Sequence, residues 1–257
     1  MNVLIPLGTG AGKATAFRNC NKQTTSNVIQ LDNGKMVLID CGDGILNALT
    51  KMGTPLKNIE AIFITHLHSD HVGGIISFLF NFVLESCHVF APKGLNLLIE
   101  TFKFISQSTI PPSVYIHELE FVDAENIATL SNGIKVSAVT LPHEIQSFGF
   151  IFLDKRGLVV GILGDTKGRE LSQLHKVHVL VHECTYGMES TLKYMHSNPK
   201  IAAECAESVF ADYLLLTHFS PRYQTLQSIQ KETAKFTDAE VVILNDFQPF
   251  DLKIIDV

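Results

Sequence analysis

The sequence predicts an α/β protein in which two β-sheets pack together and helices cover their outer faces. Two observations support this fold class. Short apolar runs bounded by turn residues recur along the whole chain, as expected for strands, and segments with helical character lie between them in both halves. Apolar residues make up 46% of the 257 residues, which is enough for a substantial core. Because no low-complexity tract or linker interrupts the pattern, we expect residues 1–257 to form a single domain.

The first half alternates strands and helices whose ends are marked by turn residues. Asp32-Asn33-Gly34 is a hairpin signal between two apolar runs. Gly53 and Pro55 end the first helix, because neither residue continues a helix well. The predicted elements of this half are strands at 2–7, 26–31 and 35–40, a helix at about 43–52, a strand at 61–65, a helix opening near Val72, a strand at 87–91 and a helix at 93–105.

The second half repeats the arrangement of a strand followed by a loop. Residues 154–157 read Asp-Lys-Arg-Gly between two apolar runs, which predicts a hairpin. One helix begins where Asn198 can cap it and Pro199 can take its first turn. The predicted elements are short strands within 113–140, strands at 148–153, 158–163, 177–181 and 213–217, the helix from 199, a helix at about 223–236 and a strand at 241–244.

The composition argues against several classes of protein. A net charge of −6 with only 20 Lys and Arg residues argues against a broad surface for nucleic acid. The five cysteines are scattered and form no Cys-x-x-Cys pair, which indicates a reducing compartment. The first residues lack the features of a signal peptide, and the most apolar stretch, residues 75–84, is too short to span a bilayer. We therefore expect a cytoplasmic protein without a membrane segment.

Residues 66–71 read His-Leu-His-Ser-Asp-His and place four metal-binding side chains within six positions. Three of the 11 histidines lie here, directly after the apolar run 61–64. The cluster therefore follows a predicted buried strand, and α/β proteins usually build their sites at the carboxyl ends of strands. Imidazoles mixed with a carboxylate suit zinc or another divalent transition metal. The alternative, a polar loop with incidental histidines, is disfavoured by the density of the cluster.

Three further candidate ligands follow predicted strands one at a time. His143, Asp165 and His218 each lie within two residues of the end of an apolar run. A single polar residue at such a place is often a cap or turn residue. Three of them, in a chain that also contains the 66–71 cluster, indicate one shared metal site.

These residues make the sequence similar to the hydrolases of the metallo-β-lactamase fold. The family signature His-x-His-x-Asp-His is matched in full at 66–71, and the three later residues follow in the family's order. The resemblance runs from Leu4 to about Tyr223 and implies a four-layer αβ/βα sandwich, a homodimer and two zinc ions, with manganese as the alternative metal. It implies that one ion is bound by His66, His68 and His143 and the other by Asp70, His71 and His218, with Asp165 bridging both.

Within this family the sequence most resembles ribonuclease Z, the tRNA 3′-processing endonuclease, and related phosphodiesterases. Residues 38–44 read Leu-Ile-Asp-Cys-Gly-Asp-Gly where the family has Asp-Cys-Gly-Glu-Gly, with Asp43 in place of Glu. Residues 217–223, Thr-His-Phe-Ser-Pro-Arg-Tyr, are similar to the family motif throughout. Two shorter segments add to the likeness, Leu7-Gly8-Thr9-Gly10 and Val181-His182-Glu183-Cys184-Thr185-Tyr186.

Two departures separate the chain from ribonuclease Z. That family carries a long arm for tRNA between the third histidine and the bridging aspartate, but only 21 residues (144–164) separate His143 from Asp165. The predicted hairpin uses nearly all of them. At 196–198 the chain reads His-Ser-Asn where the family usually has His-Ser-Thr. Together with the acidic net charge, the missing arm favours a phosphodiester substrate smaller than tRNA.

The expected mechanism is hydrolysis of a phosphodiester by a water that two metal ions activate. Asp70 is expected to bind metal and to accept the proton of this water. His196 is the candidate that protonates the leaving oxygen or stabilises the phosphorane, with Glu183 orienting it, and a purely structural histidine at a helix start is the alternative. Arg222 and Lys167 are candidates for binding the substrate phosphate, with solvated surface cations as the alternative.

Three other functions stay open. The first is tRNA 3′-processing endoribonuclease activity on an RNA 3′ end, with the tRNA held by another surface or a partner. The second is a lactone or thioester hydrolase, because the same ligands serve those reactions elsewhere in the superfamily. The third is a metal-stabilised binding module without enzymatic activity, which the complete ligand set disfavours. His196 and the run Phe219-Ser220-Pro221-Arg222 favour phosphodiesters.

Other patterns are assigned structural roles. Residues 8–13 resemble a phosphate-binding P-loop, but three residues instead of four separate the glycines, and Ala14 follows Lys13 where Ser or Thr is required. We expect instead a tight loop near the metal site. Packed thiols are expected at Cys41 and Cys184, and a core or supporting role at His182. Surface or structural positions are expected for His88, His117, His175 and His178, and a dimer contact or core packing for Phe78, Phe80 and Phe82.

Overall fold

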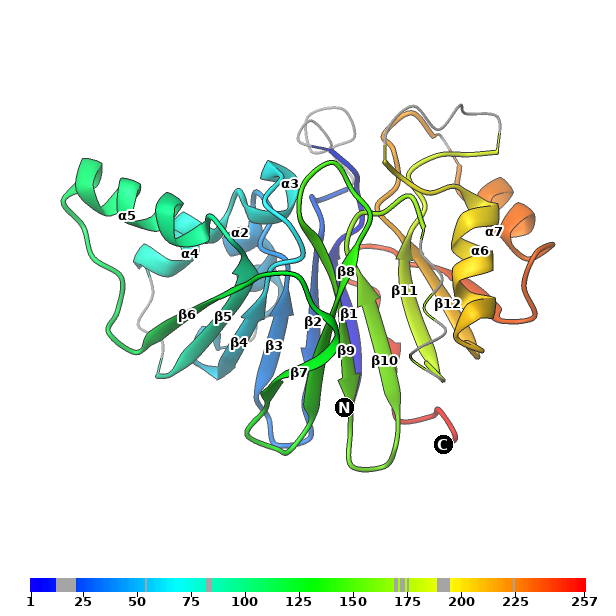
Figure 1. The fold of residues 1–257 in the computed structure, drawn as a ribbon, viewed down its shortest axis with the longest axis horizontal. Helices are drawn as coiled ribbons and strands as arrows, with labels where there is room; N and C mark the ends of the chain where they lie inside the picture. Colours follow the sequence, from blue (N-terminus) through cyan, green and yellow to red (C-terminus); the bar gives the residue numbers. More distant parts are fainter. Residues whose placement is uncertain are drawn as a thin grey trace.

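The computed structural model describes residues 1–12, 22–53, 55–81, 85–168, 171, 174, 176–188, 195–223 and 225–257. Within this part of the chain, two seven-stranded β-sheets face each other, and helices cover the outer face of each sheet (Figure 1). The layers are therefore helix, sheet, sheet and helix, which confirms the predicted αβ/βα sandwich.

The first sheet has the strand order β14-β1-β2-β3-β4-β5-β6. Its β2–β3 pair is antiparallel and is the hairpin that the turn at 32–34 predicts. From β3 to β6 neighbouring strands are parallel, so their carboxyl ends lie at the same edge of the sheet. The sequence analysis missed β14, because two residues are too few to show a period. The strands are β1 (Val3–Gly8), β2 (Ser26–Gln30), β3 (Met36–Ile39), β4 (Ile59–Phe63), β5 (Cys87–Pro92), β6 (Val114–Leu119) and β14 (Phe250–Asp251).

The second sheet has the order β13-β12-β11-β10-β9-β8-β7. Residues between His143 and Asp165 form the predicted hairpin, in which β9 pairs antiparallel with β10 from Val159↔Leu153 to Leu163↔Gly149. Strands β10 to β13 are parallel. The strands are β7 (Asp123–Thr129), β8 (Lys135–Leu141), β9 (Ser147–Leu153), β10 (Val159–Leu163), β11 (Val179–Glu183), β12 (Tyr213–Thr217) and β13 (Glu240–Ile243).

The helices lie outside the two sheets, with α2, α4 and α5 on the side of the first sheet and α6 and α7 on the side of the second (Figure 1). The Asn198 side chain accepts a hydrogen bond from the Ile201 amide at 3.0 Å, and Pro199 opens α6, as predicted. Among the described residues, no helix combines the length and the apolar character needed to cross a bilayer. The helices are α2 (Ile45–Met52), α3 (Ser69–Val72), α4 (Ile75–Asn81), α5 (Leu95–Ser106), α6 (Pro199–Ser208) and α7 (Gln227–Thr233), with a 3₁₀ turn at Leu56–Asn58.

Phenylalanine rings fill the space between the sheets. The Phe63 ring on β4 lies 5.1 Å from the ring of Phe90 and 5.1 Å from that of Phe150, and the Phe152 ring is 5.4 Å away. Burial of each such side chain stabilises the fold by about 1.5–3 kcal/mol. Because β4 is locked against the second sheet here, the loops that follow the strands of both sheets meet at one edge of the sandwich.

The four described cysteines are buried: Cys41, Cys87, Cys184 and Cys205. Cys41 and Cys184 are fully buried, as expected, and burial raises the pKa of both thiols well above the ordinary value. Both are therefore protonated packing groups at neutral pH. Cys20 lies outside the described residues.

Candidate metal centre and active site

All seven side chains predicted as metal ligands converge at this edge of the sandwich. Four lie in the loop and helical turn that follow β4, and the other three follow β8, β10 and β12, one after each strand. The donor atoms within each group lie within 4.8 Å of one another. The two groups are His66, His68, His143 and Asp165, and Asp70, His71 and His218.

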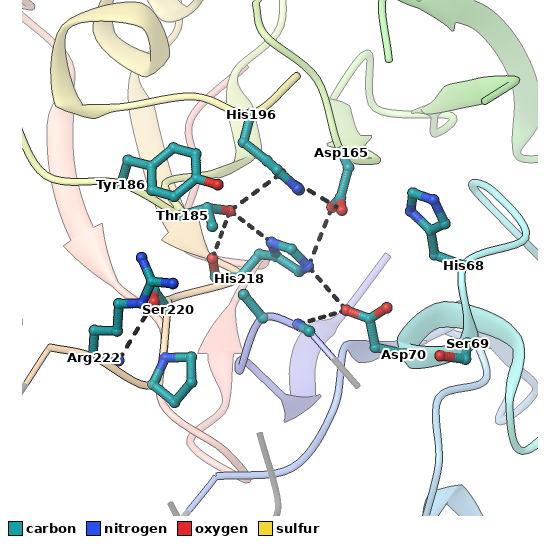
Figure 2. A pocket seen from close by; sticks show the side chains of 13 residues that line it. His68, Ser69, Asp70, Asp165, Thr185, Tyr186, His196, His218, Ser220 and Arg222 are labelled. Carbon is teal, nitrogen blue, oxygen red and sulfur yellow. Dashed lines mark hydrogen bonds and ion pairs between the residues drawn. The ribbon is translucent and has the colours of Figure 1, made fainter. Parts of the chain in front are cut away.

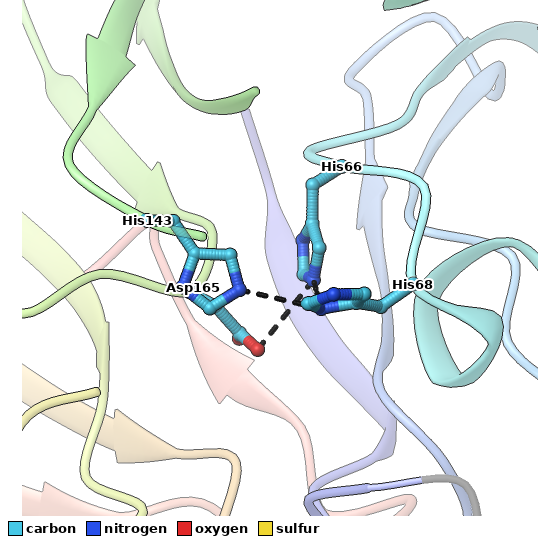
Figure 3. Close-up of side chains that lie close together, drawn as sticks. All are labelled: His66, His68, His143 and Asp165. Atoms are coloured by element: carbon cyan, nitrogen blue, oxygen red, sulfur yellow. Dashed lines mark hydrogen bonds and ion pairs between the residues drawn. The ribbon is translucent and has the colours of Figure 1, made fainter. Parts of the chain in front are cut away.

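The first group places three imidazoles around one point (Figure 3). His68 Nδ1 lies 3.1 Å from His66 Nε2 and 3.3 Å from His143 Nε2. Asp165 Oδ2 approaches to 3.5 Å from His66 Nε2. Donors about 2.0–2.1 Å from a tetrahedral zinc ion are separated by about 3.3 Å, so this spacing fits one shared ion.

The second group is more deeply buried. His71 Nε2 and His218 Nε2 lie 3.2 Å apart. Asp70 Oδ2 lies 3.4 Å from His218 Nε2 and 3.8 Å from His71 Nε2. All three residues are at least 93% buried, so the site draws on two buried imidazoles and a buried carboxylate.

Asp165 lies between the two groups and faces both. Its Oδ2 atom faces His66, while its Oδ1 atom lies 3.4 Å from His71 Nε2 and 3.4 Å from His218 Nε2. A carboxylate can offer one oxygen to each of two ions. The geometry is therefore the one that a bridging ligand requires.

The outer nitrogens of the imidazoles are held by fixed partners. His71 Nδ1 lies 2.7 Å from Asp40 Oδ2, and His143 Nδ1 donates to the Met195 carbonyl oxygen at 2.8 Å. His218 Nδ1 lies 2.8 Å from the hydroxyl of Thr185. Because a carbonyl oxygen can only accept, His143 must carry its proton on Nδ1, which leaves the Nε2 lone pair for a metal ion.

The electrostatics of the site keep its carboxylates ionised. Burial favours the neutral acid at Asp165, but the imidazoles of His218, His71 and His66 lower its pKa well below the usual value. Burial also favours the neutral acid at Asp70, but the hydrogen bond to His218 and the charges of His71 and His218 together outweigh burial and lower the pKa of Asp70. Burial, and then the charge of His71, lowers the pKa of His66 well below the ordinary value, which favours the neutral imidazole that binds metal.

His196 lines the same cavity, and its ring is paired with the Glu183 carboxylate. Its Nδ1 atom lies 2.8 Å from Glu183 Oε1 and 3.7 Å from Asp165 Oδ2. Burial disfavours the charged ring, but the hydrogen bond and charge of Glu183 outweigh it and raise the pKa of His196 to about 9. Glu183 also accepts from the Thr185 hydroxyl at 2.6 Å and from the Thr166 amide at 3.1 Å, so its carboxylate is fixed.

An open cavity of about 430 Å³ leads to the two groups (Figure 2). Arg222 lies at its wall and is exposed, as a phosphate contact requires. Lys167 is not among its described lining residues. Its amide donates to the Pro142 carbonyl, and its side chain lines a separate hollow beside α6. The lining residues are Ala11, Gly12, His68, Ser69, Asp70, Asp165, Thr185, Tyr186, His196, His218, Ser220, Pro221 and Arg222.

The backbone around the site is constrained. Asp40 and His218 adopt left-handed conformations, with φ of 61° and 56°, which cost about 1–3 kcal/mol each for a residue other than glycine. A Cβ atom at Gly42 would lie 2.5 Å from the Asp70 carbonyl oxygen, so glycine allows these segments to meet. The Gly12 amide donates to Asp70 Oδ2 at 2.6 Å, which agrees with the expected tight loop near the metal site, whereas Lys13 lies outside the described residues.

Sequence reasoning gave no role to the residues that hold the ligands in place. Asp40, Thr65, Thr185 and the Met195 carbonyl are all in contact with predicted ligands. A supporting role for Asp40 and Thr185 could have been predicted, because both residues lie inside the family motifs that follow strands, at 38–44 and 181–186. Nothing in the sequence identifies a carbonyl as a partner. His182 is fully buried, as expected for a core histidine, and His175 lies outside the described residues.

Comparisons with known proteins agree with the geometry. A sequence model of the family described as "Anti-Pycsar protein Apyc1" matches residues 3–243. Ribonuclease Z of Bacillus mycoides is 29% identical over 300 residues, an alignment that covers 91% of this chain and 95% of that protein. The crystal structure of human tRNase Z, short form (ELAC1), has a TM-score of 0.80 at 28% identity and covers 97% of this chain and 98% of that chain. The metallo-β-lactamase fold protein YhfI from Bacillus subtilis has a TM-score of 0.81 at 16% identity, with 97% and 99% covered, and supports the fold alone.

Proposed function

The chain belongs to the Anti-Pycsar protein Apyc1 family and is a metal-dependent hydrolase of the metallo-β-lactamase fold similar to ribonuclease Z, and on this basis we propose that it is a binuclear zinc phosphodiesterase acting on a small phosphodiester. The observation that carries the proposal is the position of Asp165. Its two oxygens face two separate groups of ligands beside the Glu183–His196 pair, in one open cavity.

The residues present fit two divalent ions. Five imidazoles, three of which have an outer nitrogen held by a fixed partner, and two ionised carboxylates form a donor set that suits zinc, with manganese as the alternative. We assign one ion to His66, His68 and His143. The other is assigned to Asp70, His71 and His218, with Asp165 shared. When bound, the two ions would supply Lewis acidity at the phosphate and lower the pKa of a water toward about 7.

The remaining roles follow from charge and position. His196, with a pKa raised to about 9, carries a proton at neutral pH, so we assign it to donating that proton to the leaving oxygen. Glu183 is its positioning residue. Asp70 holds its negative charge at neutral pH, so we assign it to binding metal and to accepting the hydrogen of the attacking water.

Three observations favour a small substrate over tRNA. The residues between His143 and Asp165 form only the β9–β10 hairpin. The alignment with Bacillus mycoides ribonuclease Z spans 300 positions, more than the 257 residues of this chain, so that protein contains segments that this chain lacks. The net charge is −6. Cleavage of a tRNA precursor is the second candidate function, because the likeness to ribonuclease Z extends over 91% of the chain.

The test is a set of parallel assays on the zinc-loaded protein. Its substrates are bis-p-nitrophenyl phosphate, a cyclic nucleotide, a tRNA precursor and a lactone. We expect hydrolysis of the two small phosphodiesters, loss of this activity after chelation and recovery with zinc or manganese. Cleavage of the tRNA precursor alone would favour the second candidate, and hydrolysis of the lactone alone would reject both.

Arg222 and Lys167 form a matched pair for substrate binding. Both are exposed cations a few residues beyond a proposed ligand, but Arg222 alone lines the described cavity wall. We expect Arg222→Gln to raise KM by about tenfold, since a charge-assisted hydrogen bond contributes about 1.5–3 kcal/mol. Lys167→Gln should leave KM within about twofold of the parent value. Equal effects of the two substitutions would remove Arg222 from the phosphate site.

We further propose a cytoplasmic homodimer, with α5 at the interface. Of the two roles expected at Phe78, a dimer contact or core packing, core packing is confirmed because Phe78 is fully buried, and Phe82 lies outside the described residues. On α5, Leu97, Phe104 and Ile105 are each more than 70% exposed, and a self-complementary apolar patch suits a two-fold contact. Phe104→Glu should shift the mass in solution, measured by light scattering, from dimer to monomer. Ser108→Glu, an exposed control just beyond the same helix, should not.

A further inference from the structure

A second pair of histidines lines a cavity separate from that of the active site. His88 is near the start of β5, and His117 lies on the neighbouring strand β6. The His88 Nδ1 atom lies 2.9 Å from His117 Nε2. Both side chains are exposed and line a cavity of about 560 Å³, in a region to which neither the ligands nor the proposed mechanism extends. The sequence analysis gave these histidines only a surface or structural position.

We propose that His88 and His117 form a separate bidentate site for a divalent transition metal, with Cu²⁺ or Ni²⁺ as the preferred ions. The site lies on the face of β5 and β6 that looks toward β7, at the open edge between the sheets. Phe90 lies two residues beyond His88 on the same strand face and packs in the core between the sheets.

The spacing of the two ring nitrogens supports chelation. It is close to the 3.1–3.3 Å found between the imidazoles of the active site. With metal–nitrogen distances of about 2.0–2.1 Å, nitrogens 2.9 Å apart subtend an angle of about 90° at the ion. This is the angle between adjacent ligands in square-planar and octahedral coordination, which Cu²⁺ and Ni²⁺ prefer, whereas a tetrahedral zinc ion requires a wider angle.

The two rings are held in place by aromatic neighbours. His117 stacks on Phe90 with ring centroids 4.6 Å apart, and His88 stacks on Tyr115 at 5.0 Å. The His88 and His117 rings are within 15° of parallel. Because both residues lie on paired parallel strands and their rings are already packed, little side-chain entropy is lost when an ion binds.

The cavity leaves space beside the two rings for the other ligands of an ion. Glu60 and Glu85 also line it, with their carboxylates already bonded to Ser131 and Lys35, and its volume leaves room for waters in the remaining coordination positions. Burial, and then the charge of His88, lowers the pKa of His117, which favours the neutral ring that binds metal. An ion here would tie β5 to the edge strand β6. Of the two residues, His88 lies near the amino-terminal end of β5, whereas the active site lies beyond the carboxyl ends of the parallel strands.

The test uses the zinc-loaded protein, so that the active site is already filled. Calorimetric titration with Cu²⁺ or Ni²⁺ should find one site more in the parent protein than in His117→Gln, and at least tenfold weaker binding in the variant. Electron paramagnetic resonance of the Cu²⁺ form should report two nitrogen ligands in the parent and fewer in the variant. Hydrolysis of bis-p-nitrophenyl phosphate should be unchanged, because neither histidine belongs to the proposed mechanism.

The partner residue supplies a second variant. His88→Gln should give the same loss, and circular dichroism checks that both variants are folded. His178→Gln, a change to a histidine that directly precedes β11, should keep the additional site. Equal stoichiometry and affinity in the parent, His88→Gln and His117→Gln would overturn the proposal and leave the pair as an imidazole–imidazole hydrogen bond.

Discussion

The two sheets contribute to the site in different ways. The first sheet supplies four of the seven proposed ligands from one loop of six residues after β4. Backbone hydrogen bonds fix this loop, including Cys41 N to the His71 carbonyl at 2.7 Å and Gly74 N to the Cys41 carbonyl at 2.8 Å. The second sheet supplies three ligands from three different strand ends, and side chains such as Thr185 and Glu183 hold that half together.

Substitutions in the two sheets should therefore affect the site in different ways. In the first half the short covalent connection keeps the ligands near one another, so a single substitution removes one donor and leaves the others in place. In the second half each ligand depends on the packing of its own strand and on shared partners. A single substitution in the second sheet should therefore disturb more than one part of the site, either both proposed metal positions or one of them together with the proton donor.

Asp165→Asn should have the largest effect, because this residue faces both groups. The amide has nearly the same shape but lacks the charge and one acceptor oxygen. We expect the metal content to fall below two ions per chain and the phosphodiesterase activity to fall by about 10³-fold or more, since bound metal contributes several kcal/mol to charge stabilisation. Elemental analysis and steady-state kinetics measure both quantities.

Asp154 offers a matched control. It is another buried aspartate at a turn beside β10, but at the opposite end of that strand from Asp165. Asp154→Asn should lower the thermal stability and leave the metal content unchanged. Two bound ions and full activity in Asp165→Asn would contradict the bridging role.

His196→Gln should have the next largest effect and should separate chemistry from metal binding within the second half. Loss of a general acid typically lowers kcat by about 10²–10⁴-fold, while the metal content should stay at the parent value. Glu183→Gln should give a smaller loss and move the basic limb of the pH profile to lower pH, because the negative charge that raises the pKa of His196 is gone and the ring loses its proton at a lower pH. A drop in metal content equal to the drop in kcat would argue against the proton-donor role.

The smallest effects are expected from the residues behind the ligands, and they compare the two halves directly. Asp40→Asn, which tolerates the left-handed backbone at that position, should weaken metal binding by about 10–100-fold through His71. Thr185→Val should weaken it by about tenfold and also lower kcat, because Thr185 contacts both His218 and Glu183. Competition with a chelator and kinetics on a small phosphodiester measure the two effects. If Thr185→Val weakened metal binding but left kcat unchanged, the proposed difference between the two sheets would be contradicted.

The sequence was sufficient for most of the fold and for the residues that form the two groups. Periodicity and turn residues located the strands to within a few positions, and the cap at Asn198 appears as predicted. Other features depended on the folded chain. The partner of His143 is a carbonyl of Met195, which any residue type could supply. His88 and His117 are 29 positions apart in the sequence, and no local sequence pattern predicts that β6 is the neighbour of β5 that brings them together.

The Phe63 ring lies at the end of β4, three residues before His66, and this position affects how the two sheets are held together. Phe63 packs in the interior between the sheets, and three residues later His66 offers a nitrogen to the proposed metal position, to which His143 and Asp165 of the second sheet also contribute donors. An ion bound there would link the two sheets, so its binding free energy would add to the free energy of unfolding. Removal of metal from the protein should therefore lower the stability of the packing between the sheets as well as abolish hydrolysis. The melting temperature should rise with the fraction of metal sites that are occupied.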